Sequence, residues 1–363
     1  MQRADLSQLP ASALSFGLPV LASKITLIED GRLFYRGQDA VTLATTMTFE
    51  DVAFLLWTGT PGKGHQMVGA QTTQPAGLKR ALTPIQRMVI TLTYAKYGEI
   101  EKRDTSMGVN DRILRLLCSS LTPGQRRGDR LAVALQRHFA PDHPKAARLF
   151  DALLILCADH ELNASTFTVR CAASTLLLPS VAVAAGLCTL QGERHGGMTQ
   201  RWEAALRGLQ KPTDISHVLR TVQTGAVGVV DSADSLPGFG HVLYPAGDPR
   251  ATLLLNMMAH TFDCHNRWQM ARDLIDAGRQ ISGQEPTIDI ALAALVHVLK
   301  AEKGAALGWF ALGRAAGWLA HAREQADTGT MIRPRARYVG LRPRKADPFW
   351  LGQDPARNDV PRY

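Results

Sequence analysis

The hydrophobic positions of this chain recur mostly at helical spacing, with one exception near the amino terminus. Between residues 17 and 37, in GLPVLASKITLIEDGRLFYRG, apolar and polar residues alternate on either side of Asp30 and Gly31. Alternation with a period of two around an Asp-Gly pair is typical of a small β-hairpin closed by a tight turn. The segments after it follow the helical period, so the sequence predicts an all-α protein with a small amino-terminal hairpin.

Local signals predict where the first helices begin. Thr48 and Asp51 have the spacing of a capping box before FEDVAFLLW. Thr83 and Pro84 start a second helix, IQRMVITLTYAKYG, which Gly98 closes. Further helical segments are predicted at 111–119, 130–139, 145–160, 199–209, 215–225, 250–262, 265–278, 286–300 and 306–325.

Composition narrows the class of protein. The 363 residues are 45% hydrophobic and 20% charged, which is ordinary for a globular enzyme and excludes a disordered or fibrous chain. The apolar runs are too short to span a bilayer, and the amino-terminal residues lack the order of a signal peptide. The five cysteines include no C-x-x-C pair, so reduced thiols in a cytoplasmic protein are the simplest interpretation.

The net charge of +9 favours an anionic partner. Basic residues are spread along the chain except at RPRARYVGLRPRK, residues 333–345, and no groove-reading motif accompanies them. A nucleic acid and a multiply charged small molecule both fit this charge, which alone does not choose between them.

Two histidines flank a largely small and apolar stretch. His160 begins HELNA, but position 164 is alanine, so the zinc-protease pattern H-E-x-x-H is not met. His195 lies in GERHGG, where glycines allow the backbone to approach a ligand closely. Each also has a purely structural interpretation, His160 as the end of a buried helix and His195 as a turn residue.

Two further polar residues have both a functional and a structural interpretation. His241 lies in a glycine-rich loop, GFGHVLYPAGDPR, of the kind that often carries ligand contacts on a helical scaffold. Asp289, in EPTID, falls in the first turn of a predicted helix, where a carboxylate suits the helix dipole and needs no other role. The DPRA segment predicts a helix start capped by Asp248, with Arg250 just inside.

Other common site patterns are missing from the sequence. There is no dinucleotide-binding glycine motif, no P-loop and no nucleophile elbow. One crowded group of possible metal ligands matches no standard ligand spacing: His260, Asp263, Cys264 and His265.

Six motifs, taken together and in order, resemble the citrate synthase family, which includes 2-methylcitrate synthases. They are HELNAST, G-x-x-HGG, GFGH-x-x-Y…DPRA, P-x-x-D, GRAAGW-x-AH and IRPRARYVG, and the likeness runs from residues 35–37 to 338–340. The resemblance implies an all-α homodimer. It also implies a large domain of residues 1–197 plus 305–363, and a small domain of residues 198–304 that closes over the substrates.

The resemblance implies a reaction and three catalytic residues. The family joins the methyl carbon of an acyl-CoA to the ketone of oxaloacetate and then hydrolyses the thioester. Asp289 matches the base that removes the carbon-bound proton, and His195 matches the donor to the thioester oxygen. His241 matches the residue that polarises the ketone. This chemistry needs a base on carbon and a donor on oxygen at the same time.

The resemblance also implies how the dicarboxylate is bound. His160 matches an oxaloacetate contact, and Arg250, Arg314 and Arg333 match the arginines that bind the carboxylates. A guanidinium group suits this role because its fork can meet both carboxylate oxygens at once. Arg333 in the family reaches across the dimer, so the site is expected to need two chains.

No permanently bound cofactor and no metal are expected, and a coenzyme A thioester enters as a co-substrate. The expected partners are oxaloacetate, an acyl-CoA and a second copy of the chain, with neither nucleic acid nor membrane. The chain departs from the family at Pro245, where Lys or Arg often contacts a CoA phosphate, and at Thr199, where asparagine is usual. T-I-D-I-A-L replaces the common N-V-D-x-x-S around the base.

Citrate synthase, acting in the tricarboxylic acid cycle, is therefore the first functional hypothesis. A 2-methylcitrate synthase using propionyl-CoA is the nearest alternative, since one methylene in an apolar pocket is worth only about 1–3 kcal/mol. A lyase running the reaction backwards through citryl-CoA is a weaker relative. From other classes, the sequence leaves open a non-catalytic paralogue that binds a dicarboxylate or CoA, and a nucleic-acid binder using residues 333–345.

Overall fold

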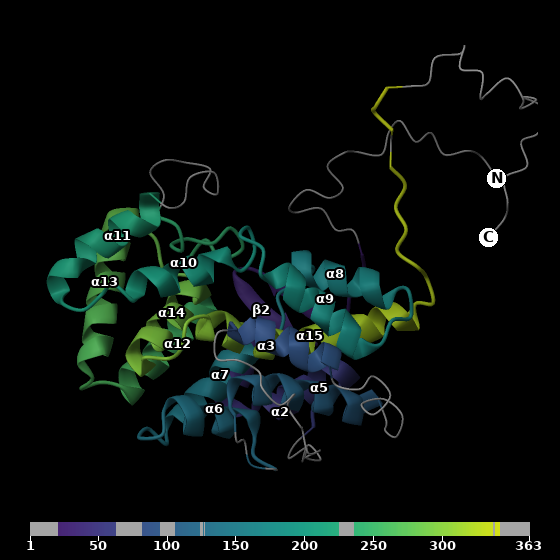
Figure 1. Ribbon diagram of the computed structural model, residues 1–363, viewed down its shortest axis with the longest axis horizontal. Coiled ribbons are helices and arrows are strands. Elements are labelled where there is room, and N and C mark those ends of the chain that lie inside the picture. Colours follow the sequence, from purple (N-terminus) through teal and green to yellow (C-terminus); the bar gives the residue numbers. More distant parts are fainter. Residues whose placement is uncertain are drawn as a thin grey trace, which may run out of the picture. The chain divides into compact units, whose positions relative to one another are not determined.

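The computed structural model describes residues 21–62, 82–94, 106–123, 126, 128–224, 236–336 and 338–341. The chain divides into two compact units, Met1–Met331 and Ile332–Tyr363. All the elements below belong to the first unit, and nearly all of them are helices, as the sequence predicts (Figure 1).

The predicted hairpin is present and carries one strand more than expected. Strands β1 (Thr26–Glu29) and β2 (Arg32–Tyr35) pair antiparallel, with Glu29 opposite Arg32. The two turn residues, Asp30 and Gly31, have φ angles of 49° and 69°, as a tight turn matched to the strand twist requires. A two-residue strand, β3 (Gln38–Asp39), extends the sheet in the order β1-β2-β3. Residues 17–20 of the predicted segment lie outside the described residues.

The helices before the His195 turn are, in chain order, α1 (Ala40–Thr46), α2 (Phe49–Thr58), α3 (Pro84–Tyr94), α5 (Ser106–Leu121), α6 (Leu131–Phe139), α7 (Ala146–Cys157), α8 (Ala164–Ala173) and α9 (Pro179–Leu190). The capping prediction at α2 is confirmed, because the Thr48 hydroxyl accepts from the Asp51 amide at 3.2 Å and donates to its carboxylate at 2.8 Å. Gly98, the predicted end of the second helix, lies outside the described residues.

The helices after that turn are α10 (Gly197–Leu206), α11 (Ile215–Thr224), α12 (Pro249–Thr261), α13 (Asn266–Ser282), α14 (Ile288–Leu299) and α15 (Ala305–Asp327), with a short 3-10 turn at Pro212–Asp214. Asp248 caps α12 as predicted. In Figure 1, α10 to α14 gather at one end of the first unit, away from α2, α5, α8 and α9.

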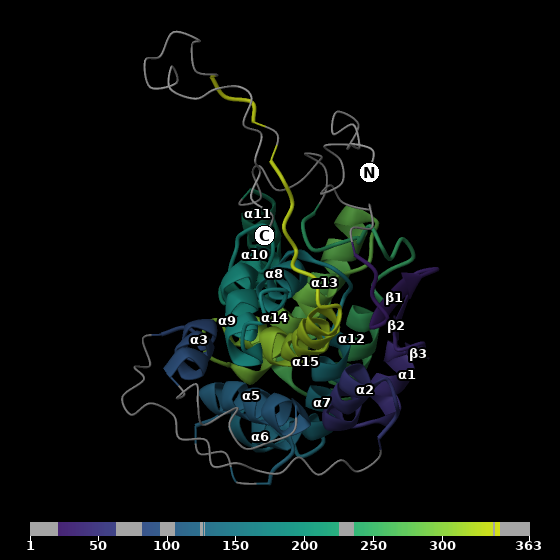
Figure 2. The same ribbon diagram turned by 90° about the vertical axis from the view of Figure 1, so that its right-hand side faces the viewer.

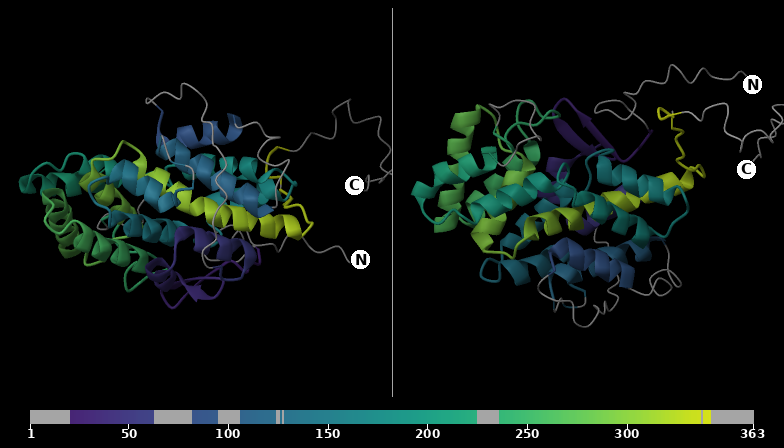
Figure 3. Two further views of the ribbon diagram at one scale, coloured as in Figure 1. Left: turned by 90° about the horizontal axis from the view of Figure 1, so that it is seen from below. Right: turned by 45° about the horizontal axis from the view of Figure 1, so that its top comes forward.

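Helix α15 forms the centre of the first unit. It packs against α2, α5, α7, α8, α9 and α14, which surround it in Figure 2 and can be followed along its length in Figure 3. Gly317 allows the closest approach. A Cβ there would lie 2.3 Å from the Ala158 carbonyl oxygen, and the Gly317 amide donates to that oxygen at 3.0 Å. This contact brings the chain just before His160 against α15.

No helix in the described ranges is long and apolar enough to cross a membrane. All five cysteines are free thiols. The division into a large and a small domain at residues 197 and 305 stays a prediction.

Candidate functional site

The structure brings His160 and His241, far apart in the sequence, into ring contact. Their ring centroids lie 5.5 Å apart at 78°. The Nε2 of His160 also shares a hydrogen bond of 2.8 Å with the hydroxyl of Tyr244. Burial, followed by the charges of Arg250 and Arg314, holds the pKa of His160 well below its usual value. The ring is therefore neutral.

His160 lies in the turn between α7 and α8. The next residue, Glu161, has a left-handed φ of 52°, which is costly for a residue with a side chain and is kept only when the surroundings fix it. Asp159 supplies part of that fixing, because it is completely buried and accepts from Thr26 at 2.6 Å and from His321 at 3.2 Å. Hydrogen bonds from β1 and from α15 to Asp159 thus hold this turn in place.

Backbone bonds hold the His241 loop against the segment that leads into α14. The Gly240 amide donates to the Glu285 carbonyl at 2.8 Å, and the Thr287 amide donates to the Gly238 carbonyl at 2.8 Å. Gly238 and Gly240 have positive φ angles of 89° and 79°, which only glycine adopts without cost. The two backbone hydrogen bonds therefore fix the position of the loop relative to the start of α14.

His241 is a neutral donor. Its Nδ1 accepts a hydrogen bond of 3.1 Å from the Leu243 amide, so the ring hydrogen of the neutral form is on Nε2. Burial, and then the nearby Arg250 charge, lower the pKa of His241, while the charges of Asp248 and Asp289 act in the opposite direction.

His195 lies in the turn just before α10 and bonds a serine of another helix. Its Nε2 is 2.8 Å from the hydroxyl of Ser165, which is fully buried on α8. Burial first, and the Arg314 charge second, lower the pKa of His195 to about 4. This histidine is therefore also neutral near pH 7.

Asp289 lies in the first turn of α14, with both carboxylate oxygens bonded to hydroxyl groups. Thr199 of α10 donates to Oδ1, and Thr287 donates to Oδ2 at 3.3 Å. Asp289 is half-buried. The Asp289 carboxylate can accept a proton, and the neutral imidazoles can donate hydrogen bonds. Together they are groups suited to general acid–base catalysis.

The two predicted site arginines that lie in the first unit, Arg250 and Arg314, differ in their partners. Arg250, 3% exposed, makes a two-pronged pair with Asp248, from Nε and Nη2, both at 2.9 Å. Arg314, 1% exposed, donates only from Nε, to the Cys157 carbonyl at 2.8 Å, and its Cζ lies 4.6 Å from the centre of the Phe310 ring. Among the described residues, the two Nη nitrogens of Arg314 have no hydrogen-bond partner.

Asp248 joins three parts of the site. Besides Arg250, it accepts from the Ile288 amide at the start of α14 at 2.9 Å. Burial acts to raise the pKa of Asp248, but the Arg250 charge and these hydrogen bonds hold it below its usual value. Arg250 also covers the ring of Tyr244, with Cζ 5.1 Å from the ring centre.

Six of the seven residues predicted for the site lie in the first unit: His160, His195, His241, Arg250, Asp289 and Arg314. Arg333 belongs to the second unit, and its role stays a prediction. Sequence patterns alone indicate no role for Ser165 or for the contact of Thr199 with the Asp289 carboxylate. Tyr244 is the tyrosine of GFGH-x-x-Y, so a sequence signal for it exists.

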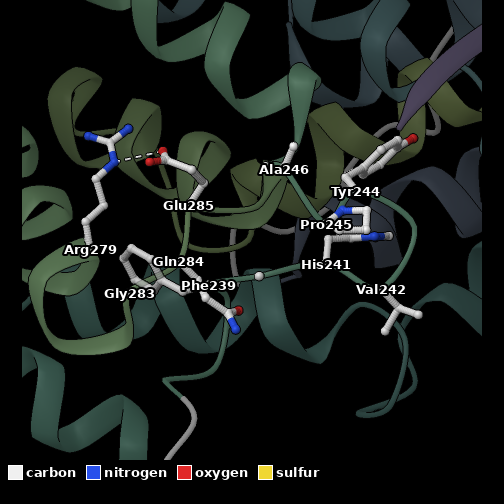
Figure 4. Close-up of a pocket in the computed structure, with 12 residues that line it drawn as sticks. Phe239, His241, Val242, Tyr244, Pro245, Ala246, Arg279, Gly283, Gln284 and Glu285 are labelled. Atoms are coloured by element: carbon white, nitrogen blue, oxygen red, sulfur yellow. Dashed lines mark hydrogen bonds and ion pairs between the residues drawn. The ribbon is translucent and has the colours of Figure 1, made fainter. Parts of the chain in front are cut away.

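A cavity of about 850 Å³ opens beside the His241 loop. Figure 4 shows His241, Val242 and Tyr244 on one side of it, with Arg279, Gln284 and Glu285 on the other. Arg279 is paired with Glu285 at 2.9 Å and with Asp276 at 2.8 Å. The lining consists of Phe239, Gly240, His241, Val242, Tyr244, Pro245, Ala246, Gly247, Arg279, Gly283, Gln284 and Glu285.

Within the described residues, no group of three or more His, Cys, Asp or Glu side chains could hold a metal ion. The four possible metal ligands noted in the sequence, His260, Asp263, Cys264 and His265, form no such group.

Comparison with known proteins gives a consistent result. Residues 14–70 and 87–335 match the family model for the citrate synthase C-terminal domain. The chain is 28% identical over 365 residues to a citrate synthase of Haloferax volcanii, covering 89% of this chain and 94% of that protein. It is 28% identical over 353 residues to a 2-methylcitrate synthase of Shewanella oneidensis, covering 89% of this chain and 92% of that protein.

Solved structures agree on the fold. The citrate synthase of Thermotoga maritima matches with a TM-score of 0.73 at 22% identity, covering 93% of this chain and 98% of that one. The citrate synthase of Thermoplasma acidophilum, solved in a ternary complex with carboxymethyl coenzyme A and oxaloacetate, matches with a TM-score of 0.73 at 22% identity, covering 92% of this chain and 97% of that one. The expected helical fold is thereby confirmed.

Proposed function

The chain belongs to the citrate synthase family, and on this premise we propose that it condenses an acyl-CoA with oxaloacetate and hydrolyses the thioester. With acetyl-CoA and water, the products are citrate and free CoA, so the acyl group becomes an alkyl group on transfer. One observation carries the proposal: a carboxylate, three neutral histidines and two buried arginines share one region of the first unit.

Removal of the thioester α-proton is the first step. Asp289 takes the proton from carbon while His195 donates a hydrogen bond to the thioester oxygen, so that an enol or enolate can form. The low pKa of His195 supports a neutral donor. In the structure the Ser165 hydroxyl donates to Asn163 Oδ1 at 2.8 Å. In the reacting state we propose that this hydroxyl turns to donate to His195 Nε2, which leaves Nδ1 as the ring donor.

Carbon–carbon bond formation is the second step. The enol carbon attacks the ketone carbon of oxaloacetate, and the ketone oxygen gains the electron pair of its double bond. His241, whose Nε2 carries the ring hydrogen, donates to that oxygen. Hydrolysis of the resulting thioester then releases CoA.

The oxaloacetate carboxylates are assigned to the arginines. Arg314 supports this most directly, because its Nη nitrogens are free for a carboxylate among the described residues. Arg250 is held in place by Asp248. His160 is the further contact, oriented by the Tyr244 hydroxyl, whose pKa burial raises to about 12. Arg333 is proposed to come from the second subunit of a homodimer.

The cavity beside the His241 loop is assigned to the acyl-CoA. His241 lies at its edge, which places the reacting end of a bound thioester near the ketone-binding histidine. Arg279 is the one arginine or lysine in the described lining, and Glu285 and Asp276 already neutralise it. Together with Pro245, this pairing supports a CoA contact different from the basic residue usual in the family.

We propose two domains, residues 1–197 plus 305–363 and residues 198–304, which close on the substrates and exclude water until condensation is complete. The gathering of α10 to α14 at one end of the first unit supports this division. Three exposed leucines in the turn between α8 and α9, Leu176, Leu177 and Leu178, offer an apolar surface to a second subunit. A cytoplasmic location and a place in the tricarboxylic acid cycle stay predictions.

The second candidate is a 2-methylcitrate synthase that takes propionyl-CoA. This candidate is supported because the chain is 28% identical both to a citrate synthase and to a 2-methylcitrate synthase. A non-catalytic paralogue would have no use for a base on carbon, and the pairing of Asp289 with two hydroxyls argues for a carboxylate held ready to act.

Release of CoA thiol from acetyl-CoA and from propionyl-CoA, each with and without oxaloacetate, tests the proposal. Oxaloacetate-dependent release is expected, and the ratio of kcat/KM between the two thioesters identifies the preferred substrate. Absence of release with both thioesters, in a protein that binds oxaloacetate, would favour the non-catalytic paralogue.

A further inference from the structure

The carboxylate of Asp289 is held by hydroxyls from two different elements. Thr287 is the residue just before α14, so it belongs to the same local segment as Asp289. Thr199 belongs to α10, ninety positions earlier in the chain, and is 2% exposed. Within the part of the chain that the structure describes, the Thr199 bond is therefore the one that links the carboxylate to another element.

Thr199 is the third residue of α10, so the carbonyl four residues earlier belongs to His195 and lies outside the helix. Its hydroxyl therefore lacks the helical acceptor that Thr46 finds in Thr42. It donates to the Asp289 carboxylate, which is its hydrogen-bond partner among the described residues.

Thr199 lies in the first turn of α10, which begins at Gly197. Its hydroxyl thus ties α10 to the side chain of Asp289 at the start of α14. An aspartate carboxylate rotates easily about its last torsion unless its oxygens are held. Fixing Oδ1 from α10 sets how the carboxylate is turned.

We propose that Thr199 is a positioning residue that holds the carboxylate of the carbon base, Asp289, in the orientation that enolisation needs. This inference rests on the proposed function. Enolisation needs the base directed at the α-carbon of the bound thioester, and a displacement of about 1 Å in such a group can cost on the order of a hundredfold in rate. Thr287 supplies a weaker constraint, because its hydroxyl belongs to the same local segment as the carboxylate and lies 3.3 Å from it.

The test compares three variants with the wild type: Thr199→Val, which keeps the shape and removes the hydroxyl, Thr199→Ser, which keeps the hydroxyl, and Thr287→Val as the matched control. Two rates are measured for each. One is kcat for CoA release with oxaloacetate, and the other is exchange of the acyl α-hydrogens with D₂O in the presence of malate, which lacks the ketone and stops the reaction before condensation.

Thr199→Val is expected to lower both rates by about 10- to 100-fold, with the KM for oxaloacetate within about twofold of the wild type because the dicarboxylate contacts are untouched. Thr199→Ser is expected to recover most of both rates. Thr287→Val is expected to lose clearly less than Thr199→Val. Should Thr199→Val not fold, Thr199→Ala removes the same hydroxyl without added bulk and replaces it in the comparison.

Several results would overturn the inference. They are wild-type rates in Thr199→Val, a loss that Thr199→Ser does not recover, or equal losses in Thr199→Val and Thr287→Val, which would point to the charge of the carboxylate and not its position. In each case an active wild type leaves the proposed function intact. A wild type without oxaloacetate-dependent CoA release would overturn the proposed function and this inference together.

Discussion

Replacing Arg314 with methionine should separate ligand binding from stability. A buried cation without a carboxylate partner is costly, and burial lowers the pKa of Arg314. Methionine keeps the apolar packing of the side chain and removes that cost. The one hydrogen bond lost, from Nε to the Cys157 carbonyl, is worth about 1 kcal/mol. We therefore expect the free energy of unfolding of the unliganded protein to change by no more than about 1 kcal/mol.

Oxaloacetate binding, unlike stability, should weaken strongly in the Arg314→Met variant. The free Nη nitrogens of Arg314 are positioned for a charge-assisted pair with a carboxylate, and truncating one partner of a buried pair of this kind costs about 2–5 kcal/mol. Taking about 3 kcal/mol, the Kd for oxaloacetate rises on the order of a hundredfold. Calorimetric titration measures the Kd, and urea unfolding without ligand measures the stability.

Arg170 offers a matched control. It is also buried, at 2% exposed, but it is paired with Glu324 at 2.6 Å and bonds Gln325 at 3.1 Å. Arg170→Met should therefore destabilise the protein by about 3–5 kcal/mol, because it leaves a buried network broken. A large loss of stability in Arg314→Met, together with an unchanged Kd for oxaloacetate, would refute the reasoning.

The remaining predictions concern the base, the histidines and the dimer. Asp289→Ala should abolish CoA release while leaving the oxaloacetate Kd nearly unchanged, because the carboxylate acts only on the acyl carbon; full activity would show that the base is another residue. Burial lowers the pKa of His195 and of His297 to about 4 each, so the unfolded chain binds more protons between that value and the usual pKa near 6.5. The urea midpoint should therefore fall as the pH is lowered through this range, and the His297→Gln variant should show a shallower fall; a midpoint independent of pH would contradict both assignments. Arg333→Ala should weaken oxaloacetate binding, and mixing it with Arg314→Ala subunits should restore about one working site per heterodimer; no recovery of activity would argue against a site shared between chains.

Features that depend on neighbouring residues were predictable from the sequence. The Asp30-Gly31 turn, the Thr48 capping box and the Asp248 cap all appear in the structure where the local chemistry indicated them. The strand β3 was not predicted, because its two residues are too few to carry an alternating pattern. Asp248 shows the limit of local reasoning: its cap was expected, but its bonds to Arg250 and Ile288 depend on the fold.

The site itself could be predicted only as a set of motifs in order. Nothing in the spacing of His160 and His241 indicates that their rings touch, because the contact depends on how the fold brings the turn between α7 and α8 against the His241 loop. Thr199 was visible only as a departure from the family. Its bond to Asp289 could not be anticipated, since it joins two helices whose bonded residues are 90 positions apart in the chain.

The central claim is that a new carbon–carbon bond forms between the acyl group and oxaloacetate. Incubation of the protein with oxaloacetate and acetyl-CoA labelled with ¹³C at both acetyl carbons, followed by mass spectrometry of the products, tests it directly. The account predicts citrate that carries both labelled carbons, formed in equal amount to free CoA. Labelled acetate with free CoA, and no labelled tricarboxylate from acetyl-CoA or from labelled propionyl-CoA, would contradict it.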